Sequence, residues 1–316
     1  MLFGVPTFAV IYYIVNMLVN SILKKKELPT DTECYGKNGY VDSEGIYIQK
    51  EKQEEIKEIQ EEILILLSEL DRVCRKNNIK YSLHGGTLLG AVRENGFIPW
   101  DDDLDIIMTH SNYNRFLKVC KEQLNSNKYY VQEGLVDWPL DYSKIKLRDT
   151  ILKEPEGYIP ATGEQGIFVD VFKLDNVSSN RFFAYWQYVC AKVLLCYQLS
   201  LRTYKSADLK KKILMYLAFP LRCGYVRDFF RRQVERLNCR ESEYWGFFYG
   251  RTKYKTSILN KRIYGTPIRV PFEDTELPVP EHYHEYLTKM FGDYMQLPPE
   301  NQRVGLHLLS VDFGRY

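Results

Sequence analysis

Residues 81–108 read YSLHGGTLLGAVRENGFIPWDDDLDIIM, and this stretch decides the fold that we expect for the chain. A short apolar run leads into two adjacent glycines, and the stretch ends with acids set among apolar residues. Because successive side chains of a strand point to opposite faces, a strand over 103–108 would place Asp103 and Asp105 on one face and apolar side chains on the other. Asp101 joins the acidic face if the extended chain reaches that far back. The stretch thus predicts a strand with one face in a core and carboxylates on the other.

The converging carboxylates predict a bound cation. Two carboxylates at strand spacing repel each other and resist desolvation, so they usually need a positive partner. Hard cations that prefer oxygen ligands, such as Mg²⁺ or Mn²⁺, meet that need. The alternative interpretation, a solvated acidic turn, suits a lone acid pair better than acids embedded in an apolar run.

The glycine pair predicts a place for an anion. Gly85-Gly86-Thr87 precedes a helix expected through Leu88–Arg93. The glycines leave room for backbone N–H groups to face a ligand, and helix N-termini attract phosphate. Most Gly-Gly pairs are only turns, but here a strand with paired acids follows closely. A phosphate-binding turn beside a pair of metal-binding carboxylates indicates a protein that acts on nucleotides.

A second β-rich run, GIFVDVFKLD at 166–175, places Asp170 among apolar neighbours. Charged residues are seldom buried unless they are paired or bind a metal. Asp170 is therefore the best candidate for a third carboxylate of the site. The alternative is an ion pair between Asp170 and Arg148 or Lys146. Asp175, at the end of the run, is expected to be a turn or helix-cap residue.

A strand expected over 142–148 carries three cations at alternate positions, which places them on one face. Lys144 is interpreted as an ordinary solvated side chain. Lys146 and Arg148 are the cations that we expect to neutralise a diphosphate.

Four segments of the sequence resemble one known family. They are HGGTLLGAVRENGFIPWDDDLDI (84–106), IKLRDT (145–150), GIFVDVFKLD (166–175) and VPEHYHEYLTKMFGDYMQLPPENQRVGLH (279–307). These segments resemble the LicD-type phosphotransferases, relatives of fukutin and fukutin-related proteins within the nucleotidyltransferase superfamily. The resemblance covers most of 51–316 and is weakest near 180–245.

The resemblance, together with the patterns above, implies a set of site residues. In the superfamily the third carboxylate supplies a metal ligand or a general base. The expected catalytic and metal-binding residues are Asp103, Asp105 and Asp170, with Asp101 as a further metal ligand. The expected phosphate-binding residues are Gly85, Gly86, Thr87, Arg93, Lys146 and Arg148.

The resemblance implies transfer of phosphocholine, or a similar phospho-alcohol, from a CDP-activated donor to a sugar hydroxyl of a cell-surface glycan. The acceptor could be lipid-linked. Mg²⁺ or Mn²⁺ would polarise the phosphoryl group. Two other readings stay open at this stage. One is a nucleotidyltransferase that leaves the nucleotide on a sugar or small molecule, and the other is an inactive membrane-associated scaffold for glycan assembly.

The expected fold class is α/β, a nucleotidyltransferase-like mixed sheet flanked by helices, with a helical insertion and a C-terminal lobe. A length of 316 residues allows one large or two modest domains. Apolar residues at helical spacing predict an amphipathic helix over 51–77. The expected divisions are an anchor at 1–23, a linker at 24–50, a catalytic core at 51–180, the insertion at 181–245 and the lobe at 246–316.

The first 23 residues carry no charge and precede Lys24-Lys25-Lys26, a pattern typical of a bilayer span whose basic flank stays cytoplasmic. The prediction is a single-pass anchor with a cytoplasmic catalytic part; the alternative is a buried or interfacial helix of a cytoplasmic protein. Seven cysteines without a Cys-x-x-Cys favour reduced thiols.

Residues 205–240 hold ten Lys and Arg against three Asp and Glu, which is +7 in a chain with a net charge of +2. Aromatic residues interleave with these cations. Such basic amphipathic segments often lie on anionic membranes, although a solvated basic face on packed helices is an equal alternative. We expect no nucleic-acid partner, because no nucleic-acid motif accompanies the charge.

Overall fold

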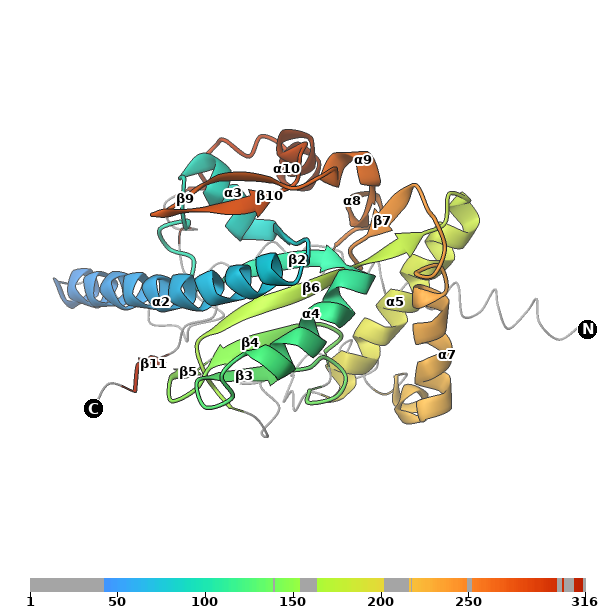
Figure 1. The fold of residues 1–316 in the computed structure, drawn as a ribbon, viewed down its shortest axis with the longest axis horizontal. Helices are drawn as coiled ribbons and strands as arrows, with labels where there is room; N and C mark the ends of the chain where they lie inside the picture. The colour runs from blue at the N-terminus through green and yellow to red at the C-terminus, as the bar shows by residue number, and fades with distance from the viewer. Residues whose placement is uncertain are drawn as a thin grey trace, which may run out of the picture.

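The fold is built around its longest strand, β6 (Phe168–Val177), in the computed structural model shown in Figure 1. The strand order of the main sheet is β1-β2-β6-β4-β3, and the second half of β6 also pairs with β7, which pairs in turn with β8. Strand β2 runs parallel to β6, whereas the other neighbours are antiparallel. The expected mixed α/β fold is confirmed. The remaining strands of this sheet are β1 (Ser82–Leu83), β2 (Asp105–Thr109), β3 (Tyr129–Gln132), β4 (Ser143–Leu147), β7 (Tyr244–Gly246) and β8 (Ile258–Asn260).

The structure describes residues 43–138, 140–153, 164–201, 216, 218–248, 252–299, 303 and 310–314. The predicted membrane anchor at 1–23 lies outside these residues. Within them, no helix combines the length and the apolar character needed to cross a bilayer.

Helix α2 (Ser43–Lys76) lies along one face of the sheet beside α4 (His110–Gln123) (Figure 1). Its inward residues are the apolar ones that recur at helical spacing, from Ile56 to Val73, and they are almost fully buried. The helix starts at Ser43, so residues 43–50, predicted as linker, are helical. One glycine near a helix start costs only about 1 kcal/mol, and Gly45 did not end this helix.

Helix α4 begins with Thr109 as its N-cap, in extended conformation, and the Thr109 hydroxyl accepts the N–H of Asn112. The helix faces the core through Tyr113, Phe116 and Cys120, which are buried.

Three elements from the last quarter of the chain and the helix after β1 lie beyond the β1–β2 edge (Figure 1). Strand β1 contacts β10, and α3 contacts β9, so the C-terminal segment packs on the helix that opens the central motif. These elements are α3 (Gly85–Arg93), β9 (Ile268–Phe272), β10 (Thr275–Val279) and α10 (Tyr283–Phe291), with the short helices α8 (Tyr254–Ser257) and α9 (Lys261–Tyr264) before them.

Helix α5 (Arg181–Leu201) packs against α7 (Gly224–Glu235) at the C-terminal end of β6, and the 3₁₀ turn η1 (Phe219–Arg222) precedes α7. The expected insertion boundary at 245 falls inside β7. A last small sheet pairs β5 (Ile151–Lys153) with β11 (Ser310–Asp312), which brings residues 310–312 beside the strand that follows β4 in the chain.

Candidate active site

Asp105 and Asp170 lie side by side on two parallel strands. They are register partners in the β2–β6 pair, and the N–H of Asp170 donates to the carbonyl of Leu104 at 2.8 Å. Neighbouring strands are about 4.8 Å apart and paired residues point to the same face, so the two carboxylates share one side of the sheet. The pairing joins two acids that are 65 positions apart in the sequence.

The glycine pair lies against these acids at the start of α3. A Cβ on Gly85 would come within 2.9 Å of Asp105 Oδ2, and one on Gly86 within 2.9 Å of Asp101 Oδ2. Gly85 also has a φ of +55°, which glycine adopts without a steric penalty. Any other residue at 85 would meet both the backbone strain and the carboxylate.

Two further hydrogen bonds hold the start of α3 on β2. The N–H of Asp105 donates to Thr87 Oγ1 at 2.9 Å, and the N–H of His84 donates to the carbonyl of Asp105 at 3.0 Å. Thr87 was predicted as a phosphate ligand, and its hydroxyl oxygen is engaged with the strand backbone here. The first turn of α3 and the acidic end of β2 thus form one rigid corner.

Lys144 is buried beside Asp170, which overturns the prediction that it is a solvated side chain. It is 2% exposed, is the register partner of Asp170 on β4, and places Nζ 3.3 Å from Asp170 Oδ1. Its Nζ also lies 3.2 Å from the centre of the Phe168 ring. All five residues of β4 are buried, so both of its faces are covered, and charge alternation along the sequence did not reveal that.

Lys146 and Arg148, predicted as diphosphate ligands or as partners of Asp170, make other contacts. Lys146 Nζ donates to the carbonyl of Glu164 at 2.6 Å, and Arg148 pairs with the Glu164 carboxylate and donates to the carbonyl of Ser126. The partner of Asp170 is Lys144 instead, because the β4–β6 register places that residue opposite it.

Arg93 is at the far end of α3, about 12 Å along the helix axis from Gly85. Its guanidinium pairs with Glu94 and donates to the carbonyl of Tyr294 at 3.2 Å. The structure therefore ties Arg93 to the C-terminal segment and does not bring it to the carboxylates.

The predicted metal ligands are only partly brought together. Within the described ranges no three His, Cys, Asp or Glu side chains form a group suited to a metal ion. The pair still fits a divalent cation, because Mg²⁺ is commonly held by one or two carboxylates while water and substrate phosphates fill its other positions. The carboxylate of Asp101 lies against Gly86, the residue next to the glycine that faces Asp105.

His84 is the buried residue that joins this corner to α10. Its Nδ1 lies 2.7 Å from the hydroxyl of Tyr286, and its ring packs edge-on against Phe247. Burial lowers the pKa of His84 to about 3, so the imidazole is neutral near pH 7. His84 is therefore a core residue that supports the corner.

Trp100, which precedes the acidic residues 101–103, packs against Arg303. The guanidinium of Arg303 lies 5.7 Å from the centre of the Trp100 ring and donates to the carbonyl of Pro298.

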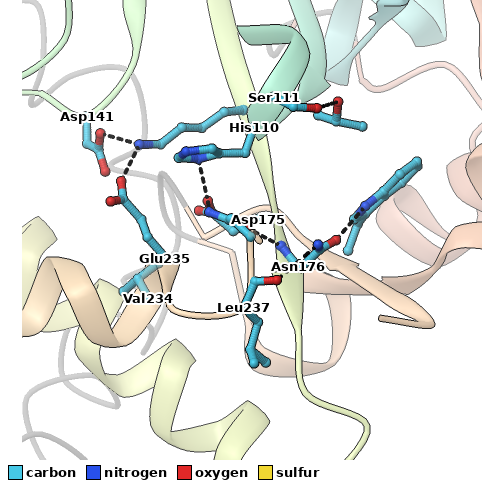
Figure 2. A network of polar contacts seen from close by, with 12 residues as sticks. His110, Ser111, Asp141, Asp175, Asn176, Val234, Glu235 and Leu237 are labelled. Carbon is cyan, nitrogen blue, oxygen red and sulfur yellow. Dashed lines mark hydrogen bonds and ion pairs between the residues drawn. The ribbon is translucent and has the colours of Figure 1, made fainter. Parts of the chain in front are cut away.

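A second polar cluster occupies the opposite face of β6 and was missed by sequence reasoning (Figure 2). Lys173 Nζ contacts Asp141 at 2.8 Å and Glu235 at 3.1 Å, while Asp175 accepts from Asn238 at 2.7 Å and lies 3.2 Å from His110 Nδ1. Asp175 is fully buried, so its assignment as a turn or cap residue was wrong. The rule that singled out Asp170, a charge in an apolar run, applies equally to Lys173 and Asp175.

The pKa values in this cluster follow from its charges. Burial raises the pKa of Asp175, but the hydrogen bond from His110 and the charge of Lys173 outweigh it, so the pKa lies below its usual range. Burial lowers the pKa of Lys173, and the surrounding acids raise it above its usual range. The cluster is therefore a charged internal network that links β6 to α4 and α7.

The mixed sheet, with paired strand acids facing a Gly-Gly helix start, is the arrangement that the resemblance to the nucleotidyltransferase superfamily led us to expect. Comparison with known proteins agrees. Residues 78–203 match the family described as LicD/FKTN/FKRP, nucleotidyltransferase domain. The chain therefore contains a domain of the LicD family, and the predicted family is confirmed.

One individual relative is similar to this protein over a longer part of the chain than the family match covers. The chain is 29% identical over 263 residues to the lipopolysaccharide cholinephosphotransferase LicD of Haemophilus influenzae, covering 79% of this chain and 96% of that protein. Shorter matches are to uncharacterized proteins of Rickettsia typhi (42% over 72 residues, 21% of this chain and 23% of that protein) and Rickettsia prowazekii (53% over 47 residues, 15% and 18%). The chain is thus homologous to a transferase of phosphorus-containing groups, as predicted.

Proposed function

We propose that the chain transfers a phospho-alcohol, with phosphocholine as the first choice, from a CDP-activated donor to a hydroxyl of a cell-surface glycan. The observation that carries the proposal is the in-register pair Asp105 and Asp170 against the first turn of α3. The name of the Haemophilus influenzae relative supports a glycan acceptor and phosphocholine as the group transferred.

In this reaction the oxygen of the acceptor hydroxyl forms a bond to the phosphorus that bears the alcohol, and the bond from that phosphorus to CMP breaks. A divalent cation, Mg²⁺ or Mn²⁺, held by Asp105 and Asp170 would supply charge to the phosphoryl oxygens. Gly85 and Gly86 leave the backbone of α3 open to a phosphate, and Asp170 accepts the proton of the hydroxyl.

Lys144 has a defined part in this proposal. Its ammonium group offsets the repulsion between the two acids and orients the Asp170 carboxylate from the β4 side. Lys144 is thus a positioning residue, because it acts on the reaction through its contact with Asp170 and not through contact with the substrate.

The setting that we propose is the cytosolic side of a membrane, where a lipid-linked acceptor would be presented. Five cysteines are free thiols, which suits a reducing compartment; they are Cys74, Cys120, Cys190, Cys223 and Cys239. Association with the bilayer is part of the proposal and is tested apart from turnover in the next subsection.

The deciding experiment incubates the full chain with Mg²⁺, an extracted glycan acceptor and a panel of CDP-alcohols, and measures CMP. We expect CMP from one donor, and a loss of at least roughly a hundredfold in rate for Asp105→Asn, because a charged ligand of the reacting phosphate is removed. Asp274→Asn, an exposed acid in the β9–β10 turn, is the matched control.

Two other outcomes would replace the proposal. Pyrophosphate release from a nucleoside triphosphate, dependent on Asp105, would make the chain a nucleotidyltransferase. If the chain showed neither turnover nor Mg²⁺-dependent nucleotide binding, the interpretation that remains would be an inactive scaffold for glycan assembly.

A further inference from the structure

Four exposed side chains follow one side of α7 and its C-cap, and a fifth precedes them at the end of η1. The four are spaced four, three and four residues apart, which places them on one helical face. Tyr225 is 90% exposed and Phe229 is 52% exposed. We name this face the arginine–aromatic stripe, and its members are Arg222, Tyr225, Phe229, Arg232 and Arg236.

The other side of α7 is already packed, so the stripe is not simply the apolar side of the helix turned outward. Val234 is 2% exposed, and Phe230 and Val226 pack against buried residues of α5 and η1. Glu235, at the end of the helix, pairs with Lys173 of β6. The inner side of the helix is therefore packed against the protein, and the stripe is a separate, exposed side.

The stripe continues at both ends onto further exposed aromatic residues. Before α7, Phe219 is 61% exposed and the Arg222 guanidinium lies 5.2 Å from its ring centre. Beyond the other end, Arg236 lies 5.7 Å from the ring centre of Phe183, which is 46% exposed. Contiguous exposed apolar side chains of this size usually mark an interaction surface.

The charge of the surface is one-sided. Asp228 pairs with Arg227 and Arg231 along the flank of α7, so no carboxylate lies within the stripe. Residues 218–240, which the structure describes, hold six Arg against Asp228 and Glu235, a net charge of +4. The complementary partner is therefore an anionic surface.

We infer that the arginine–aromatic stripe docks on the anionic phospholipid headgroups of a bilayer. Tyrosine and phenylalanine rings sit at the headgroup level of membranes, and arginine binds phosphate through paired N–H groups. From Tyr225 to Arg236 the stripe runs about 17 Å along a convex helix, which suits a flat layer of headgroups. Single-stranded nucleic acid is usually bound in a groove that tracks its backbone, and a convex helix face does not provide one.

Docking of this stripe would orient the active site. Helix α7 is joined to β6 through Glu235 and Lys173, and Asn238, just after the helix, holds Asp175 (Figure 2). The same strand carries Asp170. A bilayer bound at α7 would therefore hold the catalytic sheet in one orientation. The inference goes beyond the proposed transfer, and its test needs no turnover.

The first test places a reporter in the stripe of the full chain. Tyr225→Trp is mixed with vesicles of phosphatidylcholine alone or of phosphatidylcholine with phosphatidylglycerol, each made with and without brominated acyl chains. We expect its extra fluorescence to be quenched only by the brominated anionic vesicles, and to recover at high salt. The unsubstituted chain, with its four tryptophans, gives the background. No quenching beyond this background would overturn the inference.

The second test reverses charge in the stripe. Arg232→Glu with Arg236→Glu should lower partition into anionic vesicles by at least roughly tenfold. The matched control, Arg72→Glu with Lys118→Glu, makes the same charge change at exposed positions of α2 and α4. Far-ultraviolet circular dichroism confirms that both variants fold.

Equal partition of the two double variants would overturn the inference, because binding would then come from elsewhere, such as the apolar residues 1–23. An oligonucleotide whose binding is lost in the stripe variant while vesicle partition is unchanged would also overturn it, in favour of a nucleic-acid surface.

Discussion

At the scale of single residues, a buried lysine balances two neighbouring acids. Lys144 is the partner of Asp170, which in turn is the partner of Asp105. A buried charge that loses its partner is strongly destabilising, since the remaining ion stays desolvated.

We therefore expect Lys144→Met to lower the free energy of unfolding by about 3–5 kcal/mol. Added Mg²⁺ should restore stability more in this variant than in the unsubstituted chain, because a cation would again lie between the acids. Urea denaturation with and without Mg²⁺ measures both effects. Lys118→Met, at an exposed position of α4, should change stability by less than about 0.5 kcal/mol. A small loss of stability in Lys144→Met would mean that the two carboxylates do not need the charge of Lys144.

Gly85 gives a second residue-scale prediction. Gly85→Ala adds a methyl group 2.9 Å from Asp105 Oδ2 at a φ of +55°. Gly292, with a φ of +76° and nothing within 4 Å of an added Cβ, isolates the backbone cost alone, which is about 1–2 kcal/mol. We expect Gly85→Ala to destabilise more than Gly292→Ala, and only the former to slow CMP release. Equal effects on turnover would show that the carboxylate contact is unimportant.

At the scale of elements, β6 carries different chemistry on its two faces. Asp170 belongs to the candidate active site, whereas Lys173 and Asp175 bind the strand to α4 and α7. The same ten residues thus position the catalytic carboxylate and support the helical region behind it.

The pH dependence of stability should report this second face. The pKa of Asp175 in the folded chain is below its ordinary value of about 3.9, so the folded state binds fewer protons there than the unfolded state. Its contribution is therefore present above pH 4 and is lost as the pH falls through the lowered pKa.

The stability difference between the unsubstituted chain and Asp175→Asn should thus be largest near pH 7 and shrink below about pH 4. Urea unfolding at pH 7 and pH 3.5 measures this, with Asp274→Asn as an exposed control. A difference that does not change with pH would contradict a lowered pKa at Asp175.

At the scale of the whole molecule, the last quarter of the chain closes over the first strands. Tyr286 reaches His84 across 202 positions of sequence, and Arg93 reaches the carbonyl of Tyr294. The active-site corner is therefore supported by a segment that folds back from the far end of the protein.

Tyr286→Phe should cost about 1–3 kcal/mol, because it leaves a buried imidazole nitrogen without its hydroxyl partner. Tyr225→Phe, at a position 90% exposed, should be nearly neutral. Urea unfolding followed by circular dichroism and by tryptophan fluorescence tests whether the C-terminal segment unfolds together with the sheet. Two separate transitions would indicate that it does not support the corner.

The local sequence pattern was sufficient to predict many of the elements of this protein. The apolar spacing of α2, the β-rich run of β6 and the glycines before α3 are properties of neighbouring residues, and each was predicted at close to its observed place. Asp105 and Asp170 were singled out because a charge in an apolar run needs a partner, which is also a local argument.

Which partner each charge receives was decided only by the tertiary structure. The register of β4 against β6 set Lys144 against Asp170 and sent Lys146 to Glu164, and a shift of two residues would have placed Lys146 opposite Asp170. The depth of β4 in the sheet likewise decided that Lys144 is buried. By itself the sequence determined the elements and the acids of the site, because these depend on residues close together along the chain. Strand order and register determined the ion pairs, because they join residues that are far apart in it.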